Sequence, residues 1–132
     1  MLVDEVSDTS LVRESLLSKL GLRGVEKPMI LKGVGGTSRK LAFKEVSLDL
    51  ETVDGKYTTV TARSLPEVSS ELPRINWKQL KASYSHLADL PLAEAGGRVD
   101  LLLGSDHLYL LNPTETREGN SEEPCAVKTK LG

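Results

Sequence analysis

An Asp-Gly pair between two strand-like runs constrains the fold of this chain more than any other feature of its sequence. Apolar and polar residues alternate over residues 41–51, the pattern of a strand with one buried face. Asp54-Gly55 follows, and a second run, rich in Thr and Val, extends over residues 57–65. An Asp-Gly turn flanked in this way is the strongest short-range signal of a β-hairpin. We therefore expect these two runs to pair as antiparallel strands.

Further strand signals occur on both sides of this hairpin. Residues 28–31 are expected to form a strand that leads into the glycine cluster of residues 33–36, which predicts a loop or hairpin tip. The nearly continuous apolar run of residues 99–104 is typical of a strand buried on both faces. A polar loop over residues 112–124 should precede a closing strand over residues 125–131. These segments predict an all-β fold, β-rich with two or three short helices.

The helical segments are short. Apolar residues at positions 12, 16, 17 and 20 share one face, which predicts a helix capped by Asp8, Thr9 or Ser10 and stopped by Gly21. A second helix should begin after Asn76 and end before Pro91, with Trp77 as a packing anchor. Residues 105–111 are a candidate for a third.

Composition narrows the functional classes. The chain has 132 residues, so one domain over residues 1–132 is expected. A net charge of -2 gives no basic excess, so neither a nucleic acid nor a membrane surface is expected as a partner. Cys125, the single cysteine, is predicted to be a small buried residue, and two histidines cannot build a structural zinc site, so no metal and no cofactor are expected. Without a signal peptide or membrane span, a cytoplasmic, intracellular location is expected. Both ends look cut, which favours a domain excised from a longer protein.

The common nucleotide-binding and catalytic motifs give little evidence of a function in this sequence. The glycine cluster lacks both the dinucleotide-binding spacing and the Gly-Lys-Ser/Thr of a phosphate loop. No serine stands in a Gly-x-Ser-x-Gly setting. His86 and His107 are interpreted as surface or capping residues, and the charged residues 117–123 as a solvated loop. An apolar run also delivers Asp4 into a polar turn, where an aspartate taken alone is more often a cap or turn residue than a catalyst. What stands out is its combination with the glycine cluster about thirty residues on and a later apolar strand that ends in glycine.

Five segments give the chain a resemblance to a known family, the retropepsin-like aspartic peptidase domain of Bel/Pao-type LTR retrotransposons. They occur in the family's order and cover nearly the whole chain. The segments are LVDEVSDTSLV at 2–12, KGVGGT at 32–37, WKQLK at 77–81 with HLADLPL at 86–92, GGRVDLLLGSDH at 96–107, and TKLG at 129–132.

The resemblance implies a retropepsin-like acid-protease barrel that works as a homodimer on an extended polypeptide substrate. Each subunit would contribute one catalytic aspartate, Asp4, with Ser7 as hydrogen-bonding support. The flap over the substrate would be formed by Gly33, Val34, Gly35 and Gly36. The strand beneath the aspartate turn would contain Leu102, Leu103 and Gly104. Asp4 is preferred to Asp8 because it keeps the family's distance to Leu11-Val12.

The supporting positions next to Asp4 depart from the family pattern, because Glu5 and Val6 stand where the family has Ser or Thr and then Gly. Two functions therefore stay open. The first is an active aspartic endopeptidase that processes a retrotransposon polyprotein. The alternative is a catalytically inactive or domesticated domain that serves dimerisation or peptide binding.

Overall fold

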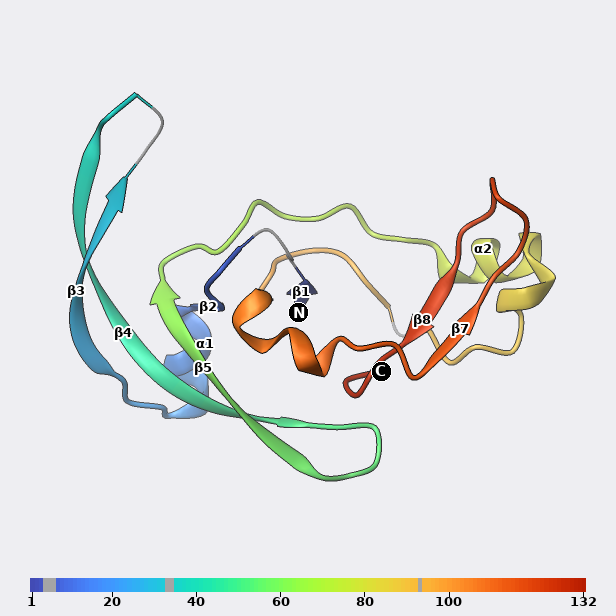
Figure 1. Cartoon of the computed structure of the whole chain (residues 1–132), viewed down its shortest axis with the longest axis horizontal. Helices are drawn as coiled ribbons and strands as arrows, with labels where there is room; N and C mark the ends of the chain where they lie inside the picture. Colours follow the sequence, from blue (N-terminus) through green and yellow to red (C-terminus); the bar gives the residue numbers. More distant parts are fainter. Residues whose placement is uncertain (4–6, 33–34, 93) are drawn as a thin grey trace.

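A six-stranded sheet and a separate two-stranded hairpin form the framework of the protein (Figure 1). The structure is a computed structural model that describes residues 1–3, 7–32, 35–92 and 94–132. Strand order in the large sheet is β1-β6-β2-β5-β4-β3. The predicted β-rich character is thus confirmed.

Two long hairpins that share β4 make up one side of the large sheet. β3 (Val25–Lys32) pairs antiparallel with β4 (Ser38–Glu51), and β4 pairs antiparallel with β5 (Tyr57–Leu65). Gly55 adopts a φ of 76°, the left-handed conformation that the tight turn between β4 and β5 requires. The hairpin predicted from Asp-Gly is confirmed, and β5 has the predicted bounds.

The other side of the sheet has three short strands with an unusual order. β1 (Leu2–Val3) and β2 (Leu11–Arg13) follow each other along the chain, yet β6 (Leu101–Leu103) lies between them. β6 runs parallel to β1 and antiparallel to β2. All three residues of β6 are buried, as its continuous apolar sequence predicted.

The first helix starts later than the sequence indicates. α1 comprises Glu14–Leu20, because residues 11–13 pair with β5 and β6 as strand β2 instead of forming a first helical turn. Arg13 occupies the N-cap position without a side-chain cap, so the predicted capping by Asp8, Thr9 or Ser10 is wrong. The predicted stop at Gly21 is confirmed by its left-handed φ of 66°.

The remaining helices are one or two turns long. α2 (Trp77–Ser83) begins as predicted, with the Asn76 side chain accepting a hydrogen bond from the Gln79 N–H. It ends earlier than predicted because Tyr84 is extended, and the 3₁₀ turn η1 (Ser85–Leu87) follows. A second 3₁₀ segment, η2 (Ser105–Leu110), occupies the place of the third predicted helix.

The C-terminal part corrects two expectations. β7 (Glu115–Arg117) pairs antiparallel with β8 (Ala126–Lys128), so the predicted polar loop contains a strand and the closing strand is shorter than expected. Arg117, expected in a solvated loop, contacts Asp89 at 3.3 Å and so links β7 to the segment after η1. Cys125 is exposed and not buried as predicted, because it lies in the surface connection between β7 and β8, directly before β8.

The core lies where β2, β4, β5 and β6 face α1 and η2. Its buried apolar residues are Val12, Leu17, Val46, Leu48, Val60, Ala62, Leu101, Leu103 and Leu110. Burial of this surface is the main stabilising contribution. No helix in the described ranges is long and apolar enough to cross a membrane.

Candidate functional site

The chain between β1 and β2 must cross the C-terminal end of β6, because Val3 lies opposite Leu103 and Leu11 lies opposite Leu102. Gly104 follows β6 at this crossing. A Cβ atom on Gly104 would lie 2.8 Å from the Ser7 carbonyl oxygen and 2.9 Å from the carbonyl carbon and oxygen of Thr9. Residues 7–9 therefore rest directly on the Gly104 backbone. Its φ of -93° is open to any residue, so the requirement for glycine here is steric.

Hydrogen bonds fix this contact. The Ser105 N–H and the Ser105 hydroxyl both donate to the Ser7 carbonyl, at 2.8 and 3.0 Å. The Ser7 hydroxyl donates to the Thr9 carbonyl at 2.8 Å, which closes a small turn within the segment. Asp4, Glu5 and Val6 lie outside the described residues, so the structure gives no geometry for the predicted catalytic carboxyl. It does describe residues 7–9 and the predicted strand residues Leu102, Leu103 and Gly104.

A polar cluster made by Ser10, Asp106 and His107 lies next to this contact. The Ser10 side chain is 0% exposed. Its hydroxyl donates to Asp106 Oδ1 at 2.6 Å and accepts from the Gly104 N–H at 3.0 Å, while the Ser10 N–H donates to Asp106 Oδ2 at 3.0 Å. Ser10 is thus held through both its backbone and its side chain by a carboxylate 96 residues away.

His107 extends the cluster to β5. The Thr61 N–H donates to His107 Nε2 at 3.2 Å, so the neutral ring carries its hydrogen on Nδ1. That nitrogen lies 3.1 Å from Asp106 Oδ1 and 3.1 Å from the Ser10 hydroxyl. The predicted reading of His107 as a surface or capping residue missed this bridge, since the side chain is only 12% exposed.

The cluster resembles a Ser-His-Asp triad in composition but not in accessibility. A nucleophilic serine must reach a substrate, and the buried Ser10 hydroxyl donates to the carboxylate instead of to the imidazole. Partial burial of Asp106 acts to raise its pKa, but hydrogen bonds from Ser10 and His107 outweigh burial and lower the pKa below its ordinary value. The carboxylate is thus kept ionised as an acceptor. The arrangement is suited to holding a loop.

A second polar link flanks the other end of the β2–β6 pair. The buried guanidinium of Arg13 forms an ion pair with Asp100, and the Arg13 N–H donates to the Asp100 carbonyl at 2.9 Å. Sequence reasoning missed this pair and the Ser10 cluster alike. The available signal was an aspartate on each side of the apolar run 101–104.

The predicted flap residues are only partly described. Gly33 and Val34 lie outside the described residues. Gly35 and Gly36 are exposed and adopt positive φ angles of 89° and 78° in the connection between β3 and β4. These two glycines of the cluster are therefore at a hairpin tip, as expected, and are open to solvent.

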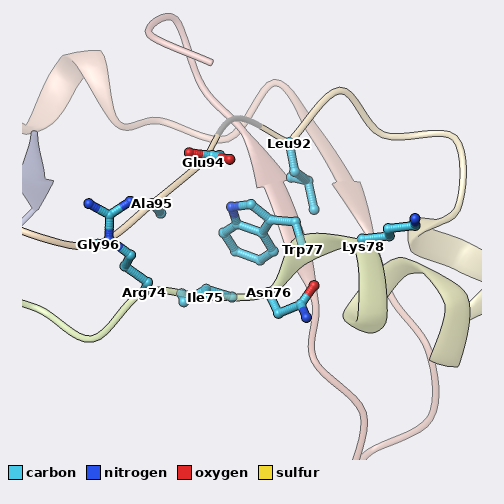
Figure 2. Close-up of a pocket in the computed structure, with 9 residues that line it drawn as sticks. All are labelled: Arg74, Ile75, Asn76, Trp77, Lys78, Leu92, Glu94, Ala95 and Gly96. Carbon is cyan, nitrogen blue, oxygen red and sulfur yellow. The ribbon is translucent and has the colours of Figure 1, made fainter.

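Hollows also occur elsewhere on the described surface, two of them beside Trp77 and beside β7 and β8. Figure 2 shows the first, about 430 Å³, where the Trp77 ring lies between segment 74–76 and residues Leu92 and Glu94. Trp77 is half-buried there, and its indole N–H has no partner among the described residues. The second, about 540 Å³, borders β7 and β8. Neither is lined by residues 7–10 or 102–107, so neither belongs to the loop contact.

Comparisons of the chain with protein-family models, with characterised proteins and with solved structures find no match. Within the described ranges, no three His, Cys, Asp or Glu side chains form a group that could hold a metal ion. The best-built polar site in these ranges is the loop contact on β6 with its Ser10 cluster.

Proposed function

We propose that this chain is a retropepsin-like aspartic endopeptidase domain in which two copies each contribute Asp4 to one catalytic site. The observation that carries the proposal is the seating of residues 7–9, which follow Asp4 after two intervening residues, on Gly104. An aspartate turn above an apolar–apolar–glycine strand is the arrangement that the family resemblance implies. The β-rich fold is compatible with it. The acid-protease barrel and the intracellular location belong to the same proposal.

The chemistry explains why two copies are needed. Two adjacent carboxyl groups cannot both ionise at low cost, so the pair shares one proton. The ionised carboxylate takes a proton from a water molecule, whose oxygen attacks the peptide carbonyl carbon. The protonated carboxyl donates its proton to the carbonyl oxygen. Collapse of the tetrahedral intermediate then breaks the C–N bond, and the amine leaves with a proton.

The β3–β4 hairpin supplies the proposed flap. The glycine cluster 33–36 connects β3 to β4 in the sequence, and glycine permits a close approach of main chain to a bound peptide. Gly35 and Gly36 are exposed, and among the described residues no atom beyond the chain neighbours lies within 4 Å of a Cβ position on either. The tip is therefore free to contact an extended polypeptide.

Cleavage of an unstructured polypeptide at mildly acidic pH tests this function. We expect Asp4→Asn to abolish cleavage and Asp8→Asn, a change of the same chemistry in the exposed part of the same loop, to preserve it. Sedimentation equilibrium should detect a dimer at the concentrations at which cleavage is seen. Cleavage that survives Asp4→Asn, or a strict monomer that is fully active, would refute the proposal.

A specific observation favours the second candidate, an inactive domain that binds an extended peptide. β3 is an edge strand, and Ile30 on it is 60% exposed. An exposed edge with unpaired backbone groups can accept an added strand, and this binding mode needs no aspartate dyad. Peptide affinity that is unchanged in Asp4→Asn and reduced in Ile30→Asp, with no cleavage by either protein, would establish this function instead.

A further inference from the structure

The loop that contains Asp4 is anchored at its far end by the Ser10 cluster. Ser10 is the last residue before β2, so its position sets where the loop returns to the sheet. Its carbonyl accepts from the Arg63 N–H of β5 at 2.9 Å, while its N–H and hydroxyl both donate to Asp106. Gly104 donates to the Ser10 hydroxyl from the end of β6. Three segments therefore meet at one buried serine.

We propose that Ser10, Asp106 and His107 are positioning residues: they hold residues 7–10 on β6 and at the end of β6, and the carboxyl group of Asp4, earlier in the same loop, depends on them for its orientation. This inference rests on the proposed function, because it names residues that serve the same site without touching substrate. Ser10 is buried and Asp106 uses both carboxylate oxygens on Ser10, so neither is free to act as a nucleophile or base.

Each of the three residues makes different contacts in the cluster. Asp106 accepts both donors of Ser10, so its loss would release the backbone and the side chain together. His107 donates from Nδ1 toward Asp106 and accepts from Thr61 at Nε2, which ties the carboxylate to β5. Since Asp106 is 32% exposed and Ser10 is fully buried, Asp106 can be replaced with less damage to the core.

Asp106→Ala is therefore the informative variant, and Asp8→Ala is its matched control. Asp8 is an exposed aspartate of the same loop whose side chain accepts a hydrogen bond only from its neighbour Thr9 in the described residues, at 3.1 Å. Amide hydrogen exchange at Ser10 and Gly104 should speed up by about tenfold or more in Asp106→Ala, because a hydrogen bond to a charged acceptor is worth at least that factor in an opening equilibrium. Asp8→Ala should leave both rates unchanged.

A second readout reports the position of Asp4 whether or not the protein cleaves anything. The carboxyl carbon resonance of Asp4 should shift in Asp106→Ala and stay unchanged in Asp8→Ala. Asp106→Asn, which keeps one acceptor oxygen and the shape of the side chain, should restore most of the wild-type resonance position. Where cleavage is measurable, Asp106→Ala should lower kcat by about tenfold or more with little change in KM, as expected when orientation is lost and binding is not.

The outcomes separate the two proposals. Absence of any Asp4-dependent cleavage by the wild-type chain overturns the proposed function, and the exchange rates and the Asp4 resonance still decide the inference. Unchanged exchange at Ser10 and Gly104 in Asp106→Ala overturns the inference even if the wild type is an active peptidase. Faster exchange with an unmoved Asp4 resonance overturns it as well, because the cluster would then hold only the end of the loop.

Discussion

Replacement of Gly104 by alanine should displace the loop that carries Asp4. The added methyl carbon would meet three backbone atoms of Ser7 and Thr9 at 2.8–2.9 Å, well inside the 3.5–4.0 Å of an ordinary carbon contact. Backbone cannot rotate away as a side chain can, so residues 7–9 must move off β6. Moving them breaks the two hydrogen bonds from Ser105 to the Ser7 carbonyl. Those bonds contribute about 1–3 kcal/mol together, and overpacking adds about 1–3 kcal/mol, for a total loss of about 2–6 kcal/mol.

Urea unfolding of the two proteins measures this loss directly. Gly21→Ala is the control. Gly21 has a positive φ, but in the described part of the chain no atom beyond its chain neighbours lies within 4 Å of its Cβ position. This variant should therefore lose only about 1–2 kcal/mol, the cost of an alanine in the left-handed conformation. The amide resonances of Ser7 and Ser105 should shift in Gly104→Ala and stay in place in Gly21→Ala. A loss in Gly104→Ala no larger than in the control, with both resonances unmoved, would refute the seating of the loop on β6.

Three other changes test the surroundings of the loop. Leu103→Ala should destabilise the protein by about 2–5 kcal/mol in urea unfolding, since Leu103 is fully buried, whereas the exposed Leu20→Ala should change stability by less than about 1 kcal/mol. Asp100→Asn leaves the buried guanidinium of Arg13 without its charged partner and should lower the free energy of unfolding by about 1–3 kcal/mol. The loss is smaller than for a fully buried pair because the Asp100 side chain is half-exposed. An unchanged midpoint of urea unfolding would contradict this prediction. The pKa of Asp106 is lowered by folding, so its ionised form contributes stability above about pH 4 that is lost as the pH falls through the folded-state pKa. The stability difference between wild type and Asp106→Asn should therefore be largest near neutral pH and shrink towards zero in acid, and a difference that grows in acid would show the sign to be wrong.

Features set by neighbouring residues could be predicted from the sequence, and features set by distant ones could not. The Asp54-Gly55 turn, the Asn76 cap and the Gly21 stop are determined within a few residues, and each is found where it was expected. Val12 shows the limit, because it fits an apolar helical face in sequence but pairs with β5 and β6 as a strand. Tertiary pairing overrode the local pattern there.

In the candidate site, too, the features set by neighbouring residues were predictable and those set by distant residues were not. The apolar run that precedes Gly104 predicted a buried strand, and the structure describes one. Ser10 looked like a helix cap because serine is common at caps, and nothing near it in sequence pointed to a carboxylate 96 residues away. Only the order of strands, with β6 between β1 and β2, brings Ser10 and Asp106 together. That order is a long-range property that no local periodicity encodes.

The two polar links on the β2–β6 pair explain how such short strands hold one register. Each strand has three residues, and the pair is antiparallel, so one end carries Ser10 with Asp106 and the other carries Arg13 with Asp100. A shift of one residue would exchange the faces of β2 and would also separate both partners. Apolar side chains of similar size, as in β6, resist such a shift only weakly because leucine can replace leucine. Directional contacts to charged groups at both ends distinguish one register from the next. The position of the loop on β6, and with it the proposed place of Asp4, therefore depends on two aspartates that need take no part in the chemistry.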